Sequence, residues 1–110
     1  MKLKRLRQVL KGCADDTRLR ILNILRDEQL TVKDICKVLS VSQTSISKHL
    51  SRLRLLKIVA DRRAGNFVYY SLDTLSDTFQ NKIVIFIILQ FPDVKIFKKD
   101  KETLRKMRSK

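Results

Sequence analysis

The chain has 110 residues, which is the size of one ordinary domain and too short for two independent cores. Two glycines, one proline, no tryptophan and 44% hydrophobic residues favour a mostly helical globular domain and exclude a loop-rich or all-β design. The longest apolar run covers residues 83–89, whereas a membrane-spanning helix needs about twenty residues. The N-terminus has no apolar stretch typical of a signal peptide, so we expect a cytoplasmic protein with no membrane partner.

Positive charge is concentrated at both ends of the chain. The formal net charge is +14, and residues 1–8 carry four basic and no acidic side chains. Residues 95–110 carry eight basic and two acidic side chains, and the middle is only mildly basic. Such ends neutralise phosphates without reading sequence, although basic tails also keep proteins soluble. The distribution favours nucleic acid as a partner.

Two helices are predicted in the first quarter of the chain. Residues 3–12 have the spacing of a short basic helix with one apolar face, which ends at Gly12. Asp15, Asp16 and Thr17 follow, and their side chains can accept hydrogen bonds from the free N–H groups at a helix start. A second helix should therefore begin there, with apolar residues at helical spacing over residues 19–25.

The next stretch predicts two helices separated by a tight turn. Thr31 and Asp34 have the spacing of a capping box and open a short helix that reaches Leu39. Residues 40–42 form the turn, and Ser42 is a suitable N-cap for a fourth helix over residues 43–56. That helix has one polar face, and its apolar stripe consists of Ile46, Leu50 and Leu53.

After residue 57 the pattern changes from helical to alternating. Residues 58–63 and 67–72 flank a Gly-Asn turn and predict a β-hairpin. Asp73 can cap a further helix over about residues 74–90, which Pro92 prevents from continuing far. We therefore expect a mainly α, winged helix-turn-helix fold in α-α-α-α-β-β-α order. Its DNA-binding and dimerisation domain covers residues 1–92, and residues 93–110 form a basic C-terminal tail or short helix.

The fourth helix has the properties of a helix that reads DNA. A major groove about 12 Å wide admits one α-helix, which needs an apolar back and a polar front. No acidic residue lies between Val38 and Val59, and the hairpin carries two arginines that could follow phosphates or simply be solvated. The candidate DNA-binding residues are Ser42, Gln43, Thr44, Ser45, Ser47, Lys48, His49, Arg52, Arg62, Arg63 and Asn66.

Three stretches, residues 14–22, 39–50 and 62–70, resemble in order the opening segment, the turn with its recognition helix, and the wing of the ArsR/SmtB repressor family. The resemblance covers about residues 8–75. It implies a homodimer joined by the first and last helices, an inverted-repeat operator and release by an inducer. The chain departs from the family at Lys57, where Gly is usual, and at Asp16, where Pro is common. The resemblance places His49 near the DNA backbone, while the alternative is a packed histidine that fixes the helix to the wing.

The metal sites of the family find no match in this sequence. Metal-responsive members carry a Cys-x-Cys motif where this chain has residues 31–35, and Lys33 there would oppose a cation. Zinc sensors carry Asp and His ligands on the dimer helix, but residues 74–91 contain Asp77 and no histidine. Zinc needs about four ligands. We therefore expect no metal and no cofactor.

Cys13 and Cys36 are candidates for a sensor of another kind, one based on thiols. They could approach each other and form a redox switch, or bind a thiophilic species such as arsenite. Alternatively each is a small buried apolar residue, which is common for free cysteine and which the position of Cys36 beside Ile35 and Leu39 favours.

The predicted helix around residues 83–89 is apolar nearly all round, so a second copy of the chain is expected to cover it. The sequence favours a sequence-specific DNA-binding transcriptional repressor. An architectural or weakly specific nucleic-acid-binding protein of the same fold is the alternative. An enzyme is not expected, because the sequence offers no carboxylate pair, phosphate loop or nucleophile partner for its single histidine.

Overall fold

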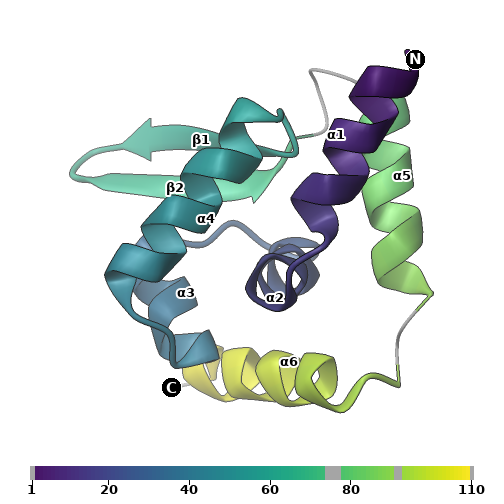
Figure 1. Cartoon of the computed structure of the whole chain (residues 1–110). Coiled ribbons are helices and arrows are strands. Elements are labelled where there is room, and N and C mark those ends of the chain that lie inside the picture. Colours follow the sequence, from purple (N-terminus) through teal and green to yellow (C-terminus); the bar gives the residue numbers. More distant parts are fainter. Residues whose placement is uncertain (1, 74–77, 91–92, 110) are drawn as a thin grey trace.

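The computed structural model of the chain describes residues 2–73, 78–90 and 93–109. Its elements are listed here in chain order and shown in Figure 1: α1 (Leu3–Cys13), α2 (Asp16–Leu25), α3 (Val32–Leu39), α4 (Gln43–Leu55), β1 (Val59–Ala64), β2 (Phe67–Leu72), α5 (Thr78–Leu89) and α6 (Lys95–Arg108). The order confirms the winged helix-turn-helix prediction and adds α6, which the sequence left open between a tail and a helix. The predicted helix start near residue 74, with Asp73 as its cap, falls next to residues outside the described ranges.

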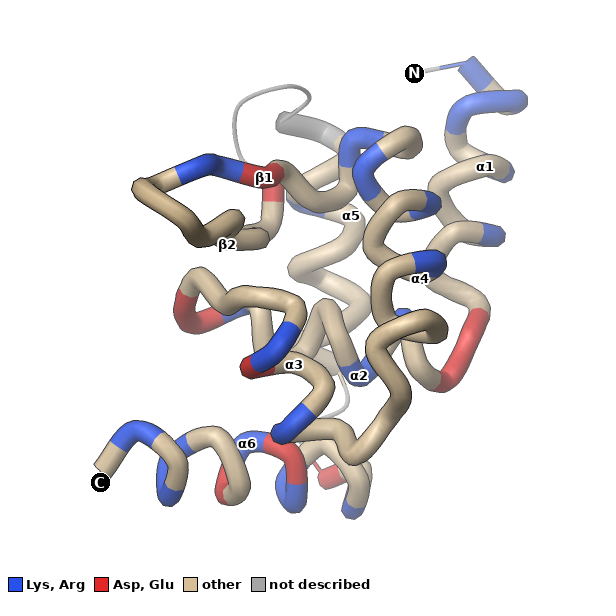
Figure 2. The backbone as a smooth tube through the Cα atoms, turned by 90° about the vertical axis from the view of Figure 1, so that its left-hand side faces the viewer, with Lys and Arg blue, Asp and Glu red and all other residues tan. Residues whose placement is uncertain are grey.

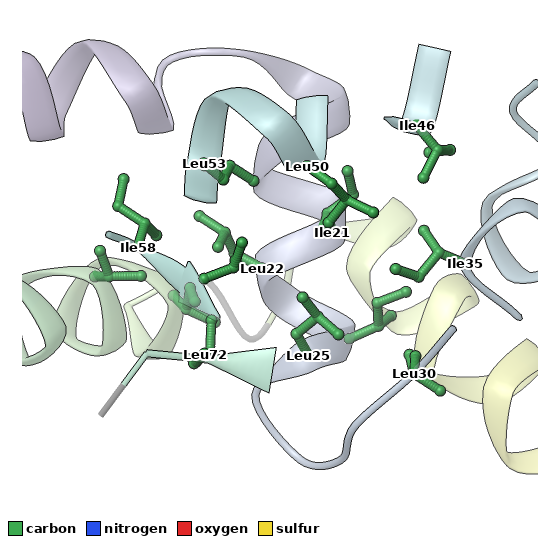
Figure 3. Packing of buried hydrophobic residues seen from close by; sticks show 14 of the residues in the cluster. Ile21, Leu22, Leu25, Leu30, Ile35, Ile46, Leu50, Leu53, Ile58 and Leu72 are labelled. Atoms are coloured by element: carbon green, nitrogen blue, oxygen red, sulfur yellow. The ribbon is translucent and has the colours of Figure 1, made fainter. Parts of the chain in front are cut away.

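The central helix α2 organises the core. It packs against each of the other five helices and against β2, and Figure 1 shows them arranged around it. Ile21, Leu22 and Ile24 of α2 are completely buried. In Figure 3 Ile21 and Leu22 lie beside Leu50 and Leu53 of α4, and the whole predicted stripe Ile46, Leu50 and Leu53 is buried. The helix α4, which the sequence predicts to read DNA and which is called the reading helix below, is thus fixed by its apolar back.

The helix starts are fixed by the predicted caps. Asp15 accepts a hydrogen bond from the Arg18 N–H at 3.0 Å at the start of α2. Thr31 and Asp34 form a reciprocal capping box at α3, with both hydrogen bonds at 3.2 Å. Ser42 caps α4 by accepting from the Ser45 N–H at 3.3 Å. These bonds satisfy N–H groups that have no acceptor inside their helices.

The C-terminus of α4 ends in a Schellman motif. The Lys57 N–H donates to the Arg54 carbonyl, and the Ile58 N–H donates to the Leu53 carbonyl, both at 2.9 Å. The motif requires a left-handed residue, and Lys57 has φ of 59°. This conformation favours glycine, which explains physically why glycine is the expected residue at this position.

The hairpin forms the wing. β1 and β2 pair antiparallel with Arg62 opposite Tyr69 and Arg63 opposite Val68. Backbone hydrogen bonds between Leu30 and Tyr70, at 2.7 and 3.0 Å, join β2 to the loop before α3. Because side chains alternate along a strand, Arg62 and Arg63 point to opposite faces of the wing.

The last helix, α6, is docked by a buried ion pair. Arg20 of α2 donates two hydrogen bonds to Asp100, at 2.8 and 2.9 Å, and Asp100 is 1% exposed. The Asn23 amide donates to the Phe97 carbonyl at 3.3 Å, and Leu104 adds a buried apolar contact. Of the two alternatives predicted for this stretch, a basic tail or a short helix, the structure therefore shows a helix, and it packs against α2 and α3.

The helix α5, which the sequence predicts as the last helix of the winged domain, lies beside α1 (Figure 1). Val84 and Ile88 face the core, whereas Phe86 is 63% and Leu89 52% exposed. Leu3 and Leu10 of α1 are exposed as well. Among the described helices, α5 included, none is long and apolar enough to cross a membrane.

Candidate nucleic-acid interface

The outer face of α4 is polar and free of acidic residues. Figure 2 shows Lys and Arg but no Asp or Glu along this helix. Four of the eight candidate residues on or next to α4 carry short hydroxyl side chains, and with the other four they give a face that donates and accepts hydrogen bonds at close range. The exposed candidates are Ser42, Gln43, Thr44, Lys48 and Arg52, and the half-buried ones are Ser45, Ser47 and His49.

The N-terminus of α4 is exposed around its cap. Ser42 is exposed, although its hydroxyl accepts the Ser45 N–H. The first backbone N–H groups of an α-helix have no intrahelical acceptor, and together with the helix dipole they favour an anion. A phosphate of a DNA backbone fits this end of the helix.

The turn before α4 is fixed from the opposite side. Ser40 ends α3 in the left-handed conformation with φ of 55°. The preceding carbonyl, of Leu39, accepts a hydrogen bond from Arg20 Nη2 at 3.0 Å. The same guanidinium that holds α6 thus also holds the end of α3, and it defines where the turn into the reading helix begins.

The two wing arginines have different surroundings. Arg62 lies 5.4 Å from the centre of the Tyr69 ring and donates to Gln29 Oε1 at 2.8 Å. Arg63 is exposed, and the structure gives it no hydrogen bond or ion pair within the described ranges. It shares a face of the wing with Asp61, whose carboxylate lies 3.6 Å from Arg54 of α4. Arg63 is therefore the more available cation, on the side of the wing that faces α4.

The remaining wing candidate, Asn66, is exposed at the turn next to Gly65, which has φ of 62°. A positive φ there is typical of a tight hairpin turn. Asn66 therefore lies at the tip of the wing, between β1 and β2.

His49 connects α4 to the start of α2. Its Nδ1 lies 3.9 Å from Asp15 Oδ1, and its side chain is 23% exposed. Asp15 is also the cap of α2 and lies 3.9 Å from Arg18. His49 of α4 thus lies beside the start of α2, whereas the packing alternative had placed it against the wing.

A buried polar cluster at the other end of α4 was missed in the sequence. The Leu56 carbonyl accepts hydrogen bonds from Arg5 of α1 and from Gln80 of α5, the latter at 2.7 Å. Arg5 also donates to the Gln80 side chain, which is 1% exposed. In the sequence Arg5 resembles any other cation of a basic terminus. Gln80 does not stand out either, because Thr78, Asn81 and Lys82 at the start of the same helix are polar as well.

The cysteines are free thiols in different environments. Cys13, at the end of α1, is buried, and burial raises the pKa of its thiol although Arg18 opposes the shift. Cys36, in α3, is half-buried, and burial raises the pKa of its thiol as well. Both groups therefore favour the protonated thiol over the nucleophilic thiolate. Within residues 2–73, 78–90 and 93–109, no three His, Cys, Asp or Glu side chains gather as a metal site would require.

Comparison with known sequences identifies related regulators. The family model described as "Bacterial regulatory protein, arsR family" matches residues 15–61. The transcriptional repressor SdpR of Bacillus subtilis is 41% identical over 66 residues, which are 60% of this chain and 73% of SdpR. The arsenic resistance transcriptional regulator ArsR1 of Pseudomonas putida is 48% identical over 65 residues, which are 58% of this chain and 51% of ArsR1.

Comparison with solved structures gives the same fold. The structure of reduced HlyU from Vibrio cholerae is similar with a TM-score of 0.72 and 28% identity, over 82% of this chain and 92% of that one. The matched residues 15–61 contain α2, α3, α4 and the start of the wing, which carry most of the candidate DNA-binding residues.

Proposed function

Since this chain belongs to the arsR family of bacterial regulatory proteins, we propose that it is a transcriptional repressor that binds an inverted-repeat DNA operator as a homodimer. The observation that carries the proposal is the acid-free outer face of α4, held by a buried apolar back and flanked by a basic wing. In this proposal α4 enters the major groove, with Gln43 and Ser45 near base edges and Lys48 and Arg52 near phosphates.

The exposed apolar side chains of α1 and α5 support the homodimer. Phe86 and Leu89 of α5 and Leu3 and Leu10 of α1 are large, exposed and on neighbouring helices. Several exposed apolar side chains on neighbouring helices are typical of an interface. A two-fold related copy would cover it and would present two reading helices to two half-sites.

The proposed repressor responds to an inducer other than a metal bound at the family's usual sites. Lys33 stands where a thiolate ligand would be required, and Cys36 favours its protonated form. The alternative of a sensor that uses Cys13 and Cys36 requires thiolates, which the raised pKa values of both thiols disfavour at neutral pH.

Selection of bound sites from random double-stranded DNA tests the proposal. We expect an inverted repeat whose half-sites are separated by about one helical turn or a multiple of it. Gln43→Ala and Ser45→Ala should broaden the selected sequence, whereas Gln90→Ala and Ser109→Ala, at exposed positions outside the interface, should leave it unchanged.

The same experiment separates a repressor from a general nucleic-acid coat. A repressor retains a large preference for its site at physiological salt, whereas binding through basic surfaces alone loses nearly all preference. Recovery of no consensus from the selection, together with equal affinity for unrelated duplexes, would contradict the proposed function and favour an architectural role.

A further inference from the structure

A cavity of about 520 Å³ lies where α2, α5 and the start of α6 meet. Figure 1 shows these three helices around the lower right of the domain, away from the reading helix. A cavity of this size can accommodate a small organic molecule. Its wall is mainly apolar, and the apolar side chains that line it are Leu19, Ile87, Ile88, Val94, Ile96 and Phe97.

Two charged residues complete the wall, and their surroundings differ. Arg20 is already neutralised, because its guanidinium makes two hydrogen bonds to the buried carboxylate of Asp100. Asp16 is exposed at the first residue of α2, and its carboxylate has no ion pair or hydrogen bond with the part of the chain that the structure describes. The uncompensated charge at the cavity is therefore negative.

The apolar wall and the carboxylate of Asp16 together favour a ligand of one chemical class. An apolar body can fill the cavity and lose its contact with water, while a positive group near the opening pairs with Asp16. A carboxylate of the same length would be repelled by Asp16 and would find Arg20 occupied by Asp100.

The wall of the cavity is also connected to the reading helix. Arg20 donates to the Leu39 carbonyl at 3.0 Å, and the next residue, Ser40, forms the left-handed turn that leads into α4. A ligand that contacts Arg20 can therefore shift the equilibrium between arrangements of this turn, provided that it binds one arrangement more tightly than the other.

We propose that this cavity binds a hydrophobic ammonium ion, an amine or quaternary ammonium group on a hydrocarbon body, and that its occupation changes the affinity of the protein for DNA. The second half of the inference rests on the proposed function, and the first half does not.

Calorimetric titration of the full chain without DNA tests the binding site. The probe is decyltrimethylammonium below its micelle concentration, with decanol and decanoate as probes of the same chain length. We expect saturable binding of one decyltrimethylammonium ion per protomer, and weaker binding of both other probes. Absence of saturable binding, or equal binding of the three probes, would overturn the assignment.

Single substitutions test whether the probe binds in this cavity. Ile87→Trp should fill it and weaken binding at least about tenfold, whereas Ile83→Trp, one turn earlier on α5 and outside the cavity wall, should not. Asp16→Asn should weaken binding of the ammonium probe about threefold to fivefold and leave decanol unchanged. Glu102→Gln, which removes an equal charge from an exposed part of α6, is its control. An Asp16→Asn variant that binds the cation as wild type does would overturn the ligand class, even if Ile87→Trp failed to fold.

The regulatory half is tested by measuring operator affinity with and without the probe. We expect the operator Kd to change at least about threefold in wild type, and Asp16→Asn to need about threefold to fivefold more probe for the same change. Tetramethylammonium at the same concentration controls for competition between a cation and DNA phosphates. Bound probe without a change in operator affinity overturns the regulatory half. A chain that binds no specific DNA in the absence of any probe overturns the proposed function instead, and calorimetry still decides the binding site.

Discussion

The buried side chain of Gln80 donates a hydrogen bond from Nε2 to the carbonyl of Leu56, at 2.7 Å, and so joins α5 to the end of α4. Arg5 of α1 donates to the same carbonyl. The two helices with exposed apolar faces therefore both hold the C-terminus of the reading helix. In a dimer, this arrangement would transmit the geometry of the subunit contact to the spacing of the two reading helices.

Replacement of Gln80 tests this connection. We expect Gln80→Leu to lower the free energy of unfolding by about 1–2 kcal/mol, because Arg5 and the Leu56 carbonyl each lose a buried hydrogen bond to Gln80. Operator affinity should fall by more than this loss of folded protein explains, since α4 is less well positioned. Urea unfolding and anisotropy titration measure the two effects, with Gln90→Leu, at the exposed position directly after α5, as the control. Unchanged affinity in a folded Gln80→Leu variant would show that the cluster only stabilises the fold.

Lys57 should be replaceable by glycine with a gain in stability. A side chain in the left-handed region costs roughly 1 kcal/mol, and Lys57 has φ of 59°. Lys57→Gly removes this strain, whereas Lys57→Ala removes the same charge and retains the strain. We expect Lys57→Gly to be more stable than Lys57→Ala by about 0.5–1 kcal/mol in chemical denaturation. Equal stability of the two variants would mean that the turn relaxes without glycine.

Ser42 has a structural role and a proposed DNA-binding role, which two variants can separate. Ser42→Ala removes the cap of α4 and should lower the free energy of unfolding by about 1 kcal/mol. Ser42→Asp retains an acceptor for the Ser45 N–H but introduces a negative charge at the proposed DNA face. We expect Ser42→Asp to unfold nearly as wild type does and to bind DNA more weakly than Ser42→Ala. The reverse order of DNA affinities would argue against a phosphate near this end of α4.

The two wing arginines should differ in their effect on DNA binding. Arg63→Ala should weaken binding to all DNA sequences. It should also reduce the slope of log K against log salt by about the amount that one phosphate contact contributes. Arg62→Ala should change this slope less, because Arg62 already contacts Gln29 and Tyr69. Binding titrations at several salt concentrations decide between them. A larger change in slope for Arg62→Ala would place the opposite face of the wing against DNA.

The thiols should react slowly at neutral pH. Burial raises the pKa of both Cys13 and Cys36, so in the folded protein the reactive thiolate forms only at higher pH than in the unfolded chain. We expect iodoacetamide to modify Cys36 before Cys13, since Cys13 is more buried, and both faster in urea. A double Cys→Ser variant should keep its response to inducer. Loss of that response, or fast alkylation at pH 7, would support the thiol sensor.

Local patterns in the sequence were sufficient to predict the helix starts and the back of the reading helix. Thr31 with Asp34, and Ser42 with Ser45, interact over three residues, and the stripe at 46, 50 and 53 follows from helical periodicity. These features depend on neighbours along the chain, so a single sequence contains them.

Contacts between distant residues could not be predicted in the same way. Asp100 stands among lysines and resembles part of a solvated tail, and only its pairing with Arg20, 80 residues away, makes it a buried anchor. The same holds for Arg5 with Gln80 and for Arg62 with Gln29. Strand alternation is enough to predict that Arg62 and Arg63 lie on opposite faces of the wing. That Gln29 contacts Arg62 follows only from the tertiary fold.

The separation of Arg20 from Asp100 also has a consequence for synthesis of the protein. A ribosome adds about 5–20 residues per second, so Arg20 is made roughly 4–16 seconds before its carboxylate partner. During that interval Arg20 has no Asp100 to pair with. Docking of α6 is the step that buries the carboxylate of Asp100 against the guanidinium of Arg20.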